Sequence, residues 1–458
     1  MKKNGSDGIY IRETVGGMET STAATRPSRK KISKVVTTLK SDPYIWGIYL
    51  MLLLISVIEL YSASASEVVG SNVYAPLIRH GMFLGIGFAI LYIIQRTHYG
   101  YIARLSVLIG VLSWLALAYA TFFGVEINGA QRAFMIGSFT VQPPEIVKLT
   151  VIVWLAAILA KSQMSHDVKT WGIVYSAIIV AAFGGLLALN GLTNTALVML
   201  VSLSMFMICG IPMKKICIVV AVYAALFGTF YMGSKVINST SEFEKVGTEQ
   251  TETTEVADIG GDHMLGSSTQ INRIIRFLKG VHPSDEINDL NRQVIMAKFA
   301  QARGGVYGTG LGNSRESVRL PLAFSDYIYS IVIEESGLIG GIILMVLYLL
   351  LLARAGYVAY HVKRALPAFL ILGCAILVVF QALVHMAIVT GLFPVSGQPL
   401  PLISKGGTSV LVMSAAIGIM LSVSRHATRK NDGKSENDRN EAKQLGEDMG
   451  AINAAADN

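Results

Sequence analysis

The chain has 458 residues, of which 52% are hydrophobic and only 15% are charged, and its formal net charge is +8 at pH 7. Apolar runs of about 20 residues, the length needed to cross the hydrocarbon core of a bilayer, recur along it and indicate a polytopic membrane protein. The positive charge gathers beside alternate runs, so it gives no reason to expect a nucleic-acid partner.

Backbone groups inside lipid must be satisfied within their own segment, so these apolar runs predict helices. We therefore predict an all-α, polytopic integral membrane protein with about ten transmembrane helices, in which residues 42–424 form a single membrane domain. The predicted helices lie near 44–64, 79–95, 101–124, 145–161, 169–189, 192–211, 213–235, 326–353, 366–391 and 407–424.

Lysine and arginine gather in the N-terminal tail, in alternate short loops and in the C-terminal tail. Cytoplasmic loops carry such an excess, so we predict that both tails, 1–41 and 425–458, lie in the cytoplasm, as an even number of helices requires. Both tails are polar and poor in aromatic residues, which predicts disorder. Among the short loops on the outer side, the exceptions are Arg79, Arg132 and Lys405.

One long loop, 236–325, is predicted between the seventh and eighth helices on the extracytoplasmic side. Its first part, Glu242–Asp258, is rich in Thr and Glu and has no apolar period, which predicts a flexible insert. Ile271–Leu278 and Asp289–Arg303 mix basic and apolar residues at helical spacing. Both predict amphipathic helices, which lie either on the membrane surface or packed within the loop itself.

The three cysteines, Cys209, Cys217 and Cys374, all lie in apolar segments and predict neither a disulfide nor a metal site. The sequence shows no Cys/His ligand spacing and no phosphate-binding P-loop. The residues themselves therefore predict no cofactor.

Ionisable side chains at membrane depth are costly and are functional candidates by default. Glu145 and Lys148 lie three residues apart on one face of the fourth predicted helix, near its outer end. The preceding loop supplies Arg132. These three residues are candidates for binding a ligand, and an internal ion pair that locks helix to loop is the alternative for Glu145 and Lys148.

Asp326 opens the eighth predicted helix, where a capping or first-turn acid is the alternative to a functional role. Glu334 and Glu335 lie about 12 Å deeper at 1.5 Å per residue. Capping does not explain them, so they predict pairing between helices. His80 and His385 predict hydrogen-bonded packing residues within the membrane.

The segment Pro394–Ser409, between the last two predicted helices, holds three prolines, three glycines and a lysine. Free N–H groups, small residues and a lysine at an outward helix start form a ready anion site. Helix capping explains Thr408 or Ser409 alone, but not this combination. The candidate binding residues are Gln398, Ser404, Lys405, Gly406, Gly407, Thr408 and Ser409.

These clusters gather toward the outer interface. An ion or proton pump would place its charged groups at the membrane midplane, in broken helices. The pattern therefore favours binding, or chemistry, of an anionic ligand that is tethered to the outer face of the membrane.

Four motifs in this order resemble the SEDS (shape, elongation, division and sporulation) family, the FtsW/RodA type of peptidoglycan glycosyltransferase. Pro394–Ser409 is similar to the family signature Pro-x-Thr-Gly-x-x-Leu-Pro-x-x-Ser-x-Gly-Gly-x-Ser. The other three are Gly129–Arg132 with Gln142–Leu149, Ala302–Gly312 with Ser325–Tyr327, and Glu334–Gly340. Together the motifs span nearly the whole membrane region.

The chain departs from the family pattern at several positions. The family's Gln-Pro-Asp-x-Gly-Thr segment falls at Asn190–Thr195, where the aspartate is lost. Other departures are Ala133 for tryptophan, Leu322 for glutamate, Phe324 for histidine, His385 for asparagine and Lys405 for tyrosine. Asp326 and the Gly-Gly-x-Ser helix start are kept.

The resemblance implies a polymerase of lipid II, the undecaprenyl-pyrophosphate-linked disaccharide peptide, at the outer face of the bacterial cytoplasmic membrane. It implies that Asp326 is the catalytic base for the acceptor hydroxyl. Lys405, Arg132 and the N–H groups of Gly406–Ser409 would stabilise the pyrophosphate leaving group. It also implies the possible use of a divalent cation, Mg²⁺ or Mn²⁺.

The expected partner is a class B penicillin-binding transpeptidase, since glycan strands need cross-linking, together with other proteins of the division or elongation complex. The long charged N-terminal tail favours a role in cell division. Two alternatives stay open at this point. One is a lipid II flippase, in which Glu145, Lys148 and Glu334 matter more than Asp326, and the other is a non-catalytic scaffold that activates the transpeptidase.

Overall fold

The computed structural model describes residues 41–66, 75–126, 131–136, 139–164, 168–225, 273, 277–280, 287, 291–320 and 323–426. Within these ranges the side chains of 63–66, 75–77, 125–126, 131–132, 136 and 139 are not described. The predicted tails and the predicted flexible insert lie outside the described residues. Everything below concerns the described part.

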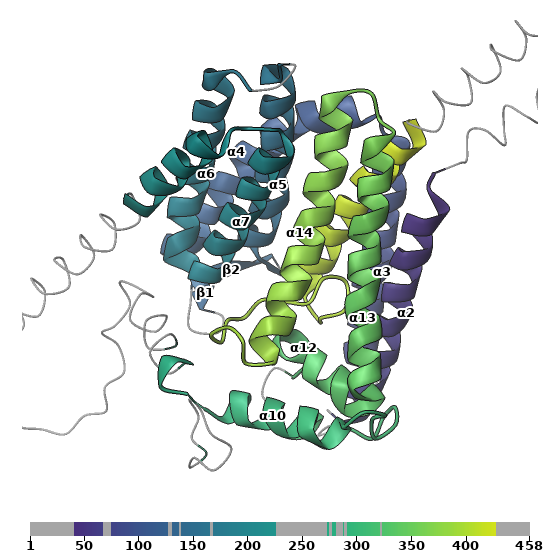
Figure 1. Ribbon diagram of the computed structural model, residues 1–458. Coiled ribbons are helices and arrows are strands. Elements are labelled where there is room, and N and C mark those ends of the chain that lie inside the picture. The colour runs from purple at the N-terminus through teal and green to yellow at the C-terminus, as the bar shows by residue number, and fades with distance from the viewer. Residues whose placement is uncertain are drawn as a thin grey trace, which may run out of the picture. The chain divides into compact units, whose positions relative to one another are not determined.

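Each of the ten predicted ranges contains a helix (Figure 1). The first seven are α2 (Pro43–Ser66), α3 (Ala75–Arg96), α4 (Tyr99–Phe123), α5 (Pro143–Ser162), α6 (Thr170–Asn190), α7 (Leu192–Ile208) and residues 213–225. The last three are α13 (Ile328–Tyr360), α14 (Ala365–Val389) and a final helix, Gly407–His426. Eight of these described helices are long and apolar enough to cross a membrane, and α7 is apolar but shorter. The prediction of a polytopic helical membrane protein is confirmed.

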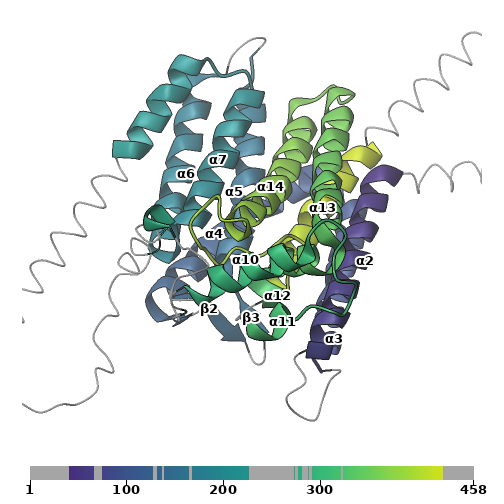
Figure 2. The same cartoon turned by 60° about the horizontal axis from the view of Figure 1, so that its bottom comes forward.

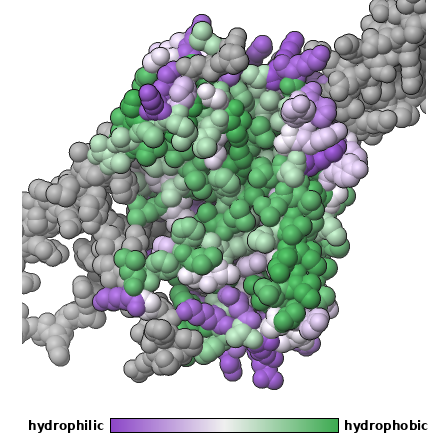
Figure 3. Space-filling model, viewed as in Figure 1, coloured by the Kyte–Doolittle hydropathy of each residue, from purple (hydrophilic) through white to green (hydrophobic). Residues whose placement is uncertain are grey.

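The helices differ in how much of their surface is covered by protein. In the most apolar stretch of the final helix 83% of the residues are buried, and in that of α14 72% are buried. The corresponding share is 28% in both α3 and α4. Figure 3 shows hydrophobic side chains over the middle of one face and hydrophilic ones toward both of its ends. The final helix and α14 therefore form the centre of the helix assembly, while α3 and α4 present apolar surface outward, as lipid contact requires.

A small sheet lies between α4 and α5, and the sequence did not predict it. Its strands are β1 (Val125–Glu126), β2 (Gln131–Ile136) and β3 (Phe139–Val141), antiparallel and in the order β1-β2-β3. The sheet ends directly before Pro143, which starts α5. It therefore forms a short connection on the side from which α5 begins.

The described stretch directly before α13 includes α10 (Arg292–Gly304), α11 (Glu316–Arg319) and α12 (Ala323–Asp326). α10 runs crosswise over the ends of α13 and α14 (Figures 1 and 2) and donates a hydrogen bond from Gln301 Nε2 to Val389 O, 2.8 Å. The helix predicted at Asp289–Arg303 is thus confirmed, and it packs within the protein through Ile295, Ala297 and Ala300. Of Ile271–Leu278, the structure describes too little to test the prediction.

α13 is broken at Gly337, whose φ is 74° and ψ −178°. The freed backbone groups are satisfied by the segment after α10: Thr309 N donates to Glu334 O (2.9 Å) and Leu338 N donates to Gly305 O (3.0 Å). Gly308 also lies so close that a Cβ there would stand 2.1 Å from Glu335 O. The chain segment after α10 therefore packs into the break. The break separates residues 328–336, here called the outer half-helix, from the long remainder of α13.

α2 is tied to α13 at both of its ends. Asp42, at the start of α2, accepts hydrogen bonds from Arg354, with Nη2 2.7 Å and Nε 2.9 Å from the same oxygen. Near the other end, Ser62 Oγ donates to Glu335. These two contacts fix the outer half-helix of α13 and the rest of α13 against one common helix.

Gly337→Ala should destabilise the protein by roughly 2 kcal/mol or more, because only glycine readily adopts this backbone conformation. The new Cβ would also lie 2.2 Å from Val306 O. The measurement is the unfolding temperature of the purified protein in detergent. The control is Gly356→Ala in the same helix, where nothing lies within 4 Å of the new Cβ. If both variants unfold at the native temperature, the break in α13 is not a constraint.

Candidate functional site

The segment Pro394–Gly406, here called the signature loop, joins α14 to the final helix and contacts α12 directly. Lys405 N donates to Phe324 O at 2.8 Å, and Ser404 Oγ donates to Ser325 O at 2.6 Å. The chain at Lys405 therefore lies against the chain at Asp326, although some 80 positions separate them in the sequence. The catalytic and binding candidates at these two positions are brought to one place.

The signature loop is held in a strained conformation. Leu402 has φ of 65°, a value that is costly for a residue with a branched side chain, and it is fully buried. The neighbouring backbone is fixed from two sides, since Tyr348 Oη donates to Pro401 O (2.6 Å) and Ser56 Oγ donates to Ile403 O (3.3 Å). Strain of this kind costs about 1–3 kcal/mol and persists where surrounding contacts determine it, typically at functional sites.

The start of the final helix packs closely against α3 and the small sheet. A Cβ on Gly407 would lie 2.5 Å from the ring of Phe83, so only glycine allows this approach. Thr408 Oγ1 donates to Thr140 O (3.0 Å) and accepts from Gln142 N (3.2 Å). Thr408 thus joins the helix start to the beginning of α5, while the buried Ser409 Oγ has no hydrogen-bond partner among the described residues.

Asp326 is the last residue of α12 and is 7% exposed. Ser325 Oγ donates to its Oδ1 at 2.9 Å. The next residue, Tyr327, is buried, and this burial, reinforced by the charge of Asp326, raises the pKa of its phenol above the ordinary value. Tyr327 is therefore a neutral neighbour that does not compete with Asp326 for protons.

Glu145 and Lys148 form a buried ion pair. Lys148 is fully buried, and its Nζ lies 2.6 Å from Glu145 Oε1, 2.7 Å from Gln381 Oε1 and 3.5 Å from Gln398 Oε1. Gln398 in turn donates from Nε2 to Asn194 Oδ1 at 2.8 Å. The geometry favours the internal pair over a ligand-facing role, because the ammonium group of Lys148 donates its hydrogen bonds to side chains of the protein. Ligand contact by these residues stays a prediction.

This buried network fixes the base of the signature loop. Gln381 Nε2 donates to Pro399 O at 3.2 Å, and His385 Nδ1 lies 2.7 Å from Gln398 O. On the other side of the site, His80 Nε2 lies 2.9 Å from Ser56 Oγ. Each of these buried histidines makes one hydrogen bond, while the second ring nitrogen of His385, Nε2, has no partner among the described residues. α5, α7, α14 and α2 therefore all position the loop that carries Lys405.

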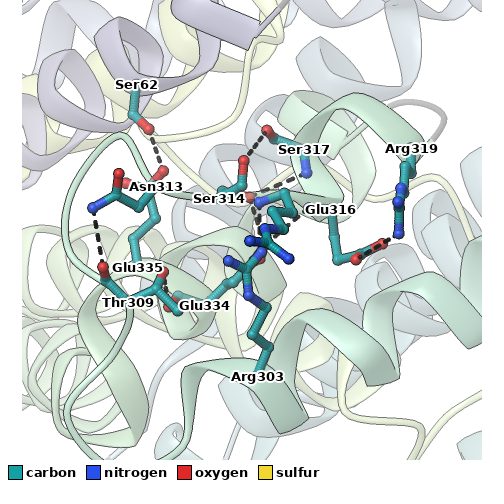
Figure 4. A network of polar contacts seen from close by, with 11 residues as sticks. Ser62, Arg303, Thr309, Asn313, Ser314, Glu316, Ser317, Arg319, Glu334 and Glu335 are labelled. Atoms are coloured by element: carbon teal, nitrogen blue, oxygen red, sulfur yellow. Dashed lines mark hydrogen bonds and ion pairs between the residues drawn. The ribbon is translucent and has the colours of Figure 1, made fainter.

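Glu334 and Glu335 lie on the outer half-helix of α13 and point to different neighbours (Figure 4). Glu334 forms an ion pair with Arg303 of α10, 3.0 Å between Nη1 and Oε1. Glu335 accepts from Ser62 of α2. Both acids therefore make contacts between helices, an ion pair for Glu334 and a hydrogen bond for Glu335. They do not line the contact between Asp326 and Lys405, and their role is in holding the elements around it.

Two further observations complete the predicted set. The backbone of Arg132 lies in β2, but its side chain lies outside the described residues, so its contact with a ligand stays a prediction. Gln381 and Asn194 were missed by the sequence analysis. A single amide within an otherwise apolar helix was a usable signal for Gln381, since polar side chains at membrane depth need partners.

Comparison with known proteins gives one consistent result. The family model of FtsW, RodA and SpoVE, described as "Cell cycle protein", matches residues 43–429. Stage V sporulation protein E of Bacillus subtilis is 28% identical over 86% of this chain and 100% of its own length. The "Probable peptidoglycan glycosyltransferase FtsW" of Coxiella burnetii is 27% identical over 82% of this chain and 95% of its own length.

Solved structures share the fold. A chain of a peptidoglycan synthase complex, from work on the structural coordination of polymerization and crosslinking, superposes with a TM-score of 0.61 at 23% identity, covering 85% of this chain and 99% of that one. The rod shape determining protein RodA of Thermus thermophilus gives 0.55 at 22% identity, covering 84% and 97%. At these identities the likeness concerns the arrangement of helices.

Lys148→Met should lower the stability by about 3–5 kcal/mol, because it leaves Glu145 buried and unpaired. The double variant Glu145→Gln/Lys148→Met should recover part of this loss. Both are measured as unfolding temperatures in detergent, with Lys161→Met on the exposed end of the same helix as control. A single variant that keeps native stability but loses binding of a lipid-linked substrate would instead make Lys148 a ligand-binding residue.

Proposed function

Since the chain belongs to the FtsW/RodA/SpoVE family, we propose that it is a peptidoglycan glycosyltransferase that polymerises lipid II into glycan strands at the outer face of the bacterial cytoplasmic membrane. The names of its FtsW relatives support the reaction class. The observation that carries the proposal is the pair of hydrogen bonds from Lys405 N and Ser404 Oγ to α12. They bring the chain next to Asp326 against the chain at Lys405, which directly precedes the start of the final helix.

The proposed reaction joins an acceptor sugar to a donor sugar that is linked to a polyprenyl pyrophosphate. Asp326 takes the proton of the acceptor hydroxyl as its oxygen forms a bond to the donor's anomeric carbon. The bond from that carbon to the pyrophosphate breaks, and its electrons go to the leaving lipid pyrophosphate. The glycan strand grows by one disaccharide for each such step.

The leaving group gains negative charge in this step. Lys405 and the free N–H groups at the start of the final helix supply positive charge and hydrogen-bond donors to it. Gly406 carries no side chain, which allows a phosphate to approach the backbone there, whereas Gly407 faces the ring of Phe83. Arg132 is proposed as a further cation for the same charge.

Use of a divalent cation, Mg²⁺ or Mn²⁺, also stays a proposal. Among the described residues no three His, Cys, Asp or Glu side chains gather as a ligand set. One carboxylate together with substrate phosphates is an ordinary way to bind Mg²⁺, and Asp326 is the residue that would hold it. Its chemistry would be the neutralisation of pyrophosphate charge.

The surroundings of the enzyme are proposed as follows. Both termini lie in the cytoplasm, which is supported by the distribution of Lys and Arg. A class B penicillin-binding transpeptidase is the partner, because the related synthase complex coordinates polymerization with crosslinking. We assign the chain to cell division, with other proteins of the division complex as further partners; the family description as a cell cycle protein supports this assignment.

One observation disfavours the transporter alternative. A transport path would expose its ionisable groups to water in one of its states. Glu145 and Lys148 are instead 2% and 0% exposed and form a hydrogen-bonded network with Gln381. A scaffold without chemistry would not need the strained loop at Leu402 beside an aspartate.

Asp326→Asn should abolish polymerisation, because an amide cannot accept the acceptor's proton. We expect a loss of at least about 100-fold, the lower range for general base catalysis. The measurement is the formation of glycan strands from lipid II by the purified protein reconstituted with its transpeptidase. Binding of the transpeptidase and the unfolding temperature serve as controls and should stay native. Unchanged polymer would favour the flippase or the scaffold.

Lys405→Met should weaken binding of lipid II several-fold and reduce the polymerisation rate, because it removes a cation from the leaving group. Its effect on the unfolding temperature should be small. Lys363→Met, which removes an exposed lysine between α13 and α14, is the matched control and should bind lipid II normally. A collapse of thermal stability in Lys405→Met would make Lys405 a structural residue.

A further inference from the structure

The chain that carries Asp326 forms a closed ring, and Glu334 closes it. Residues 315–334 leave the segment after α10, pass through α11 and α12 and enter the outer half-helix of α13. At the two ends of this stretch, Arg315 N donates to Glu334 Oε1 at 2.9 Å and Glu316 N donates to Oε2 at 3.4 Å. One carboxylate therefore joins the beginning of the stretch to its end.

The carboxylate of Glu334 is fully used. Besides the two backbone N–H groups it accepts hydrogen bonds from Ser314 Oγ and from Arg303 Nη1 (Figure 4). Its side chain is 0% exposed, while that of Arg303 is 30% exposed. Four donors, one of them cationic, suit a carboxylate. The NH₂ group of an amide at this position would face donors where it needs acceptors.

The backbone of Glu334 is fixed as firmly as its side chain. Its carbonyl oxygen accepts from Thr309 N (2.9 Å) and from Thr309 Oγ1 (3.0 Å), because the break at Gly337 has freed it from the helix. The residue thus joins the segment after α10, the start of α11 and the outer half-helix of α13. Closing a stretch of this length removes conformational freedom from everything within it.

Asp326 lies near the middle of the ring. Glu334 is eight positions further along, and its hydrogen bonds go to Arg303, Thr309 and residues 314–316, so it acts on the site through the chain. The opposite side of the ring is held by Ser404 and Lys405, which bond to Ser325 and Phe324. The ring is therefore held at its closure and at its far side, and Asp326 lies at the second of these points.

We infer that Glu334, paired with Arg303, is a positioning residue that sets the place of the Asp326 carboxylate by closing the ring 315–334. The inference rests on the proposed function for its effect on rate, but the closure itself is independent of that function. Removing the charge of Glu334 opens the ring, and Asp326 then samples positions away from the acceptor hydroxyl. The rate falls while binding of the lipid-linked substrate through Lys405 is kept.

The test compares Glu334→Gln with Asp42→Asn in the full-length protein, reconstituted with its transpeptidase and supplied with lipid II. Asp42 is a buried acid, 6% exposed, that is paired with the partly exposed Arg354 much as Glu334 is paired with Arg303, and it contacts no described residue of the ring. For Glu334→Gln we expect kcat to fall at least tenfold with KM within about twofold, and amide exchange to rise in 315–326 but not in α14. Asp42→Asn should leave kcat, KM and exchange in 315–326 unchanged.

A second pair of variants separates charge from general damage to the fold. Arg303→Lys keeps a cation beside Glu334 and should retain more of the native kcat than Arg303→Met. The inference is overturned if Glu334→Gln opens the ring by amide exchange without lowering kcat, if it lowers kcat without opening the ring, or if Arg303→Lys and Arg303→Met are equally impaired. If the native protein forms no polymer, the proposed function fails, and amide exchange in 315–326 alone decides whether Glu334 closes the ring.

Discussion

The contact between the signature loop and α12 is the interaction on which the rest of the site depends. Two short hydrogen bonds, from Lys405 N and Ser404 Oγ, join chain segments that are about 80 positions apart in the sequence. Neither bond depends on the chemical identity of Lys405, since one uses its backbone and the other uses its neighbour. The backbone at 405 therefore builds the site whatever side chain stands there.

Around this contact the protein buries polar groups, which are unfavourable in the core of a membrane. The pair of Glu145 and Lys148 is buried together with the amides of Gln381 and Gln398. Such a pair adds little net stability over an apolar packing of the same volume. It does fix the geometry of the loop it supports, since each member has a defined partner. The same logic applies to the ion pair of Glu334 and Arg303 on the other side of the site.

Much of the fold was predictable from the sequence because apolar length is a strong signal in a membrane protein. The small sheet at β1–β3 was not, since its strands are short and lie among glycines and polar residues. The break at Gly337 was also hidden, because a glycine in an apolar run is compatible with a continuous helix. Its cause is the segment 304–310, which lies outside α13 and donates to its carbonyl groups.

The candidate site, like the fold, was predictable only in part. The residues of the signature loop were recognisable from their composition. The proximity of Asp326 and Lys405 was predictable from the family resemblance and from their predicted position on the same side of the membrane. The partners that fix them were not recognisable, because Asn194, Gln381 and Tyr348 act through contacts between distant segments. A pattern along one segment carries no information about which neighbour folding will bring to it.

The closed ring at 315–334 has an evolutionary consequence. Because Arg303, Ser314 and Glu334 close the ring among the described residues, a change in the length of the loop before α10 need not displace the aspartate. Relatives are therefore free to elaborate that preceding stretch for their own surroundings while the reaction geometry is inherited intact. Variation should be concentrated upstream of the ring, and constancy within it.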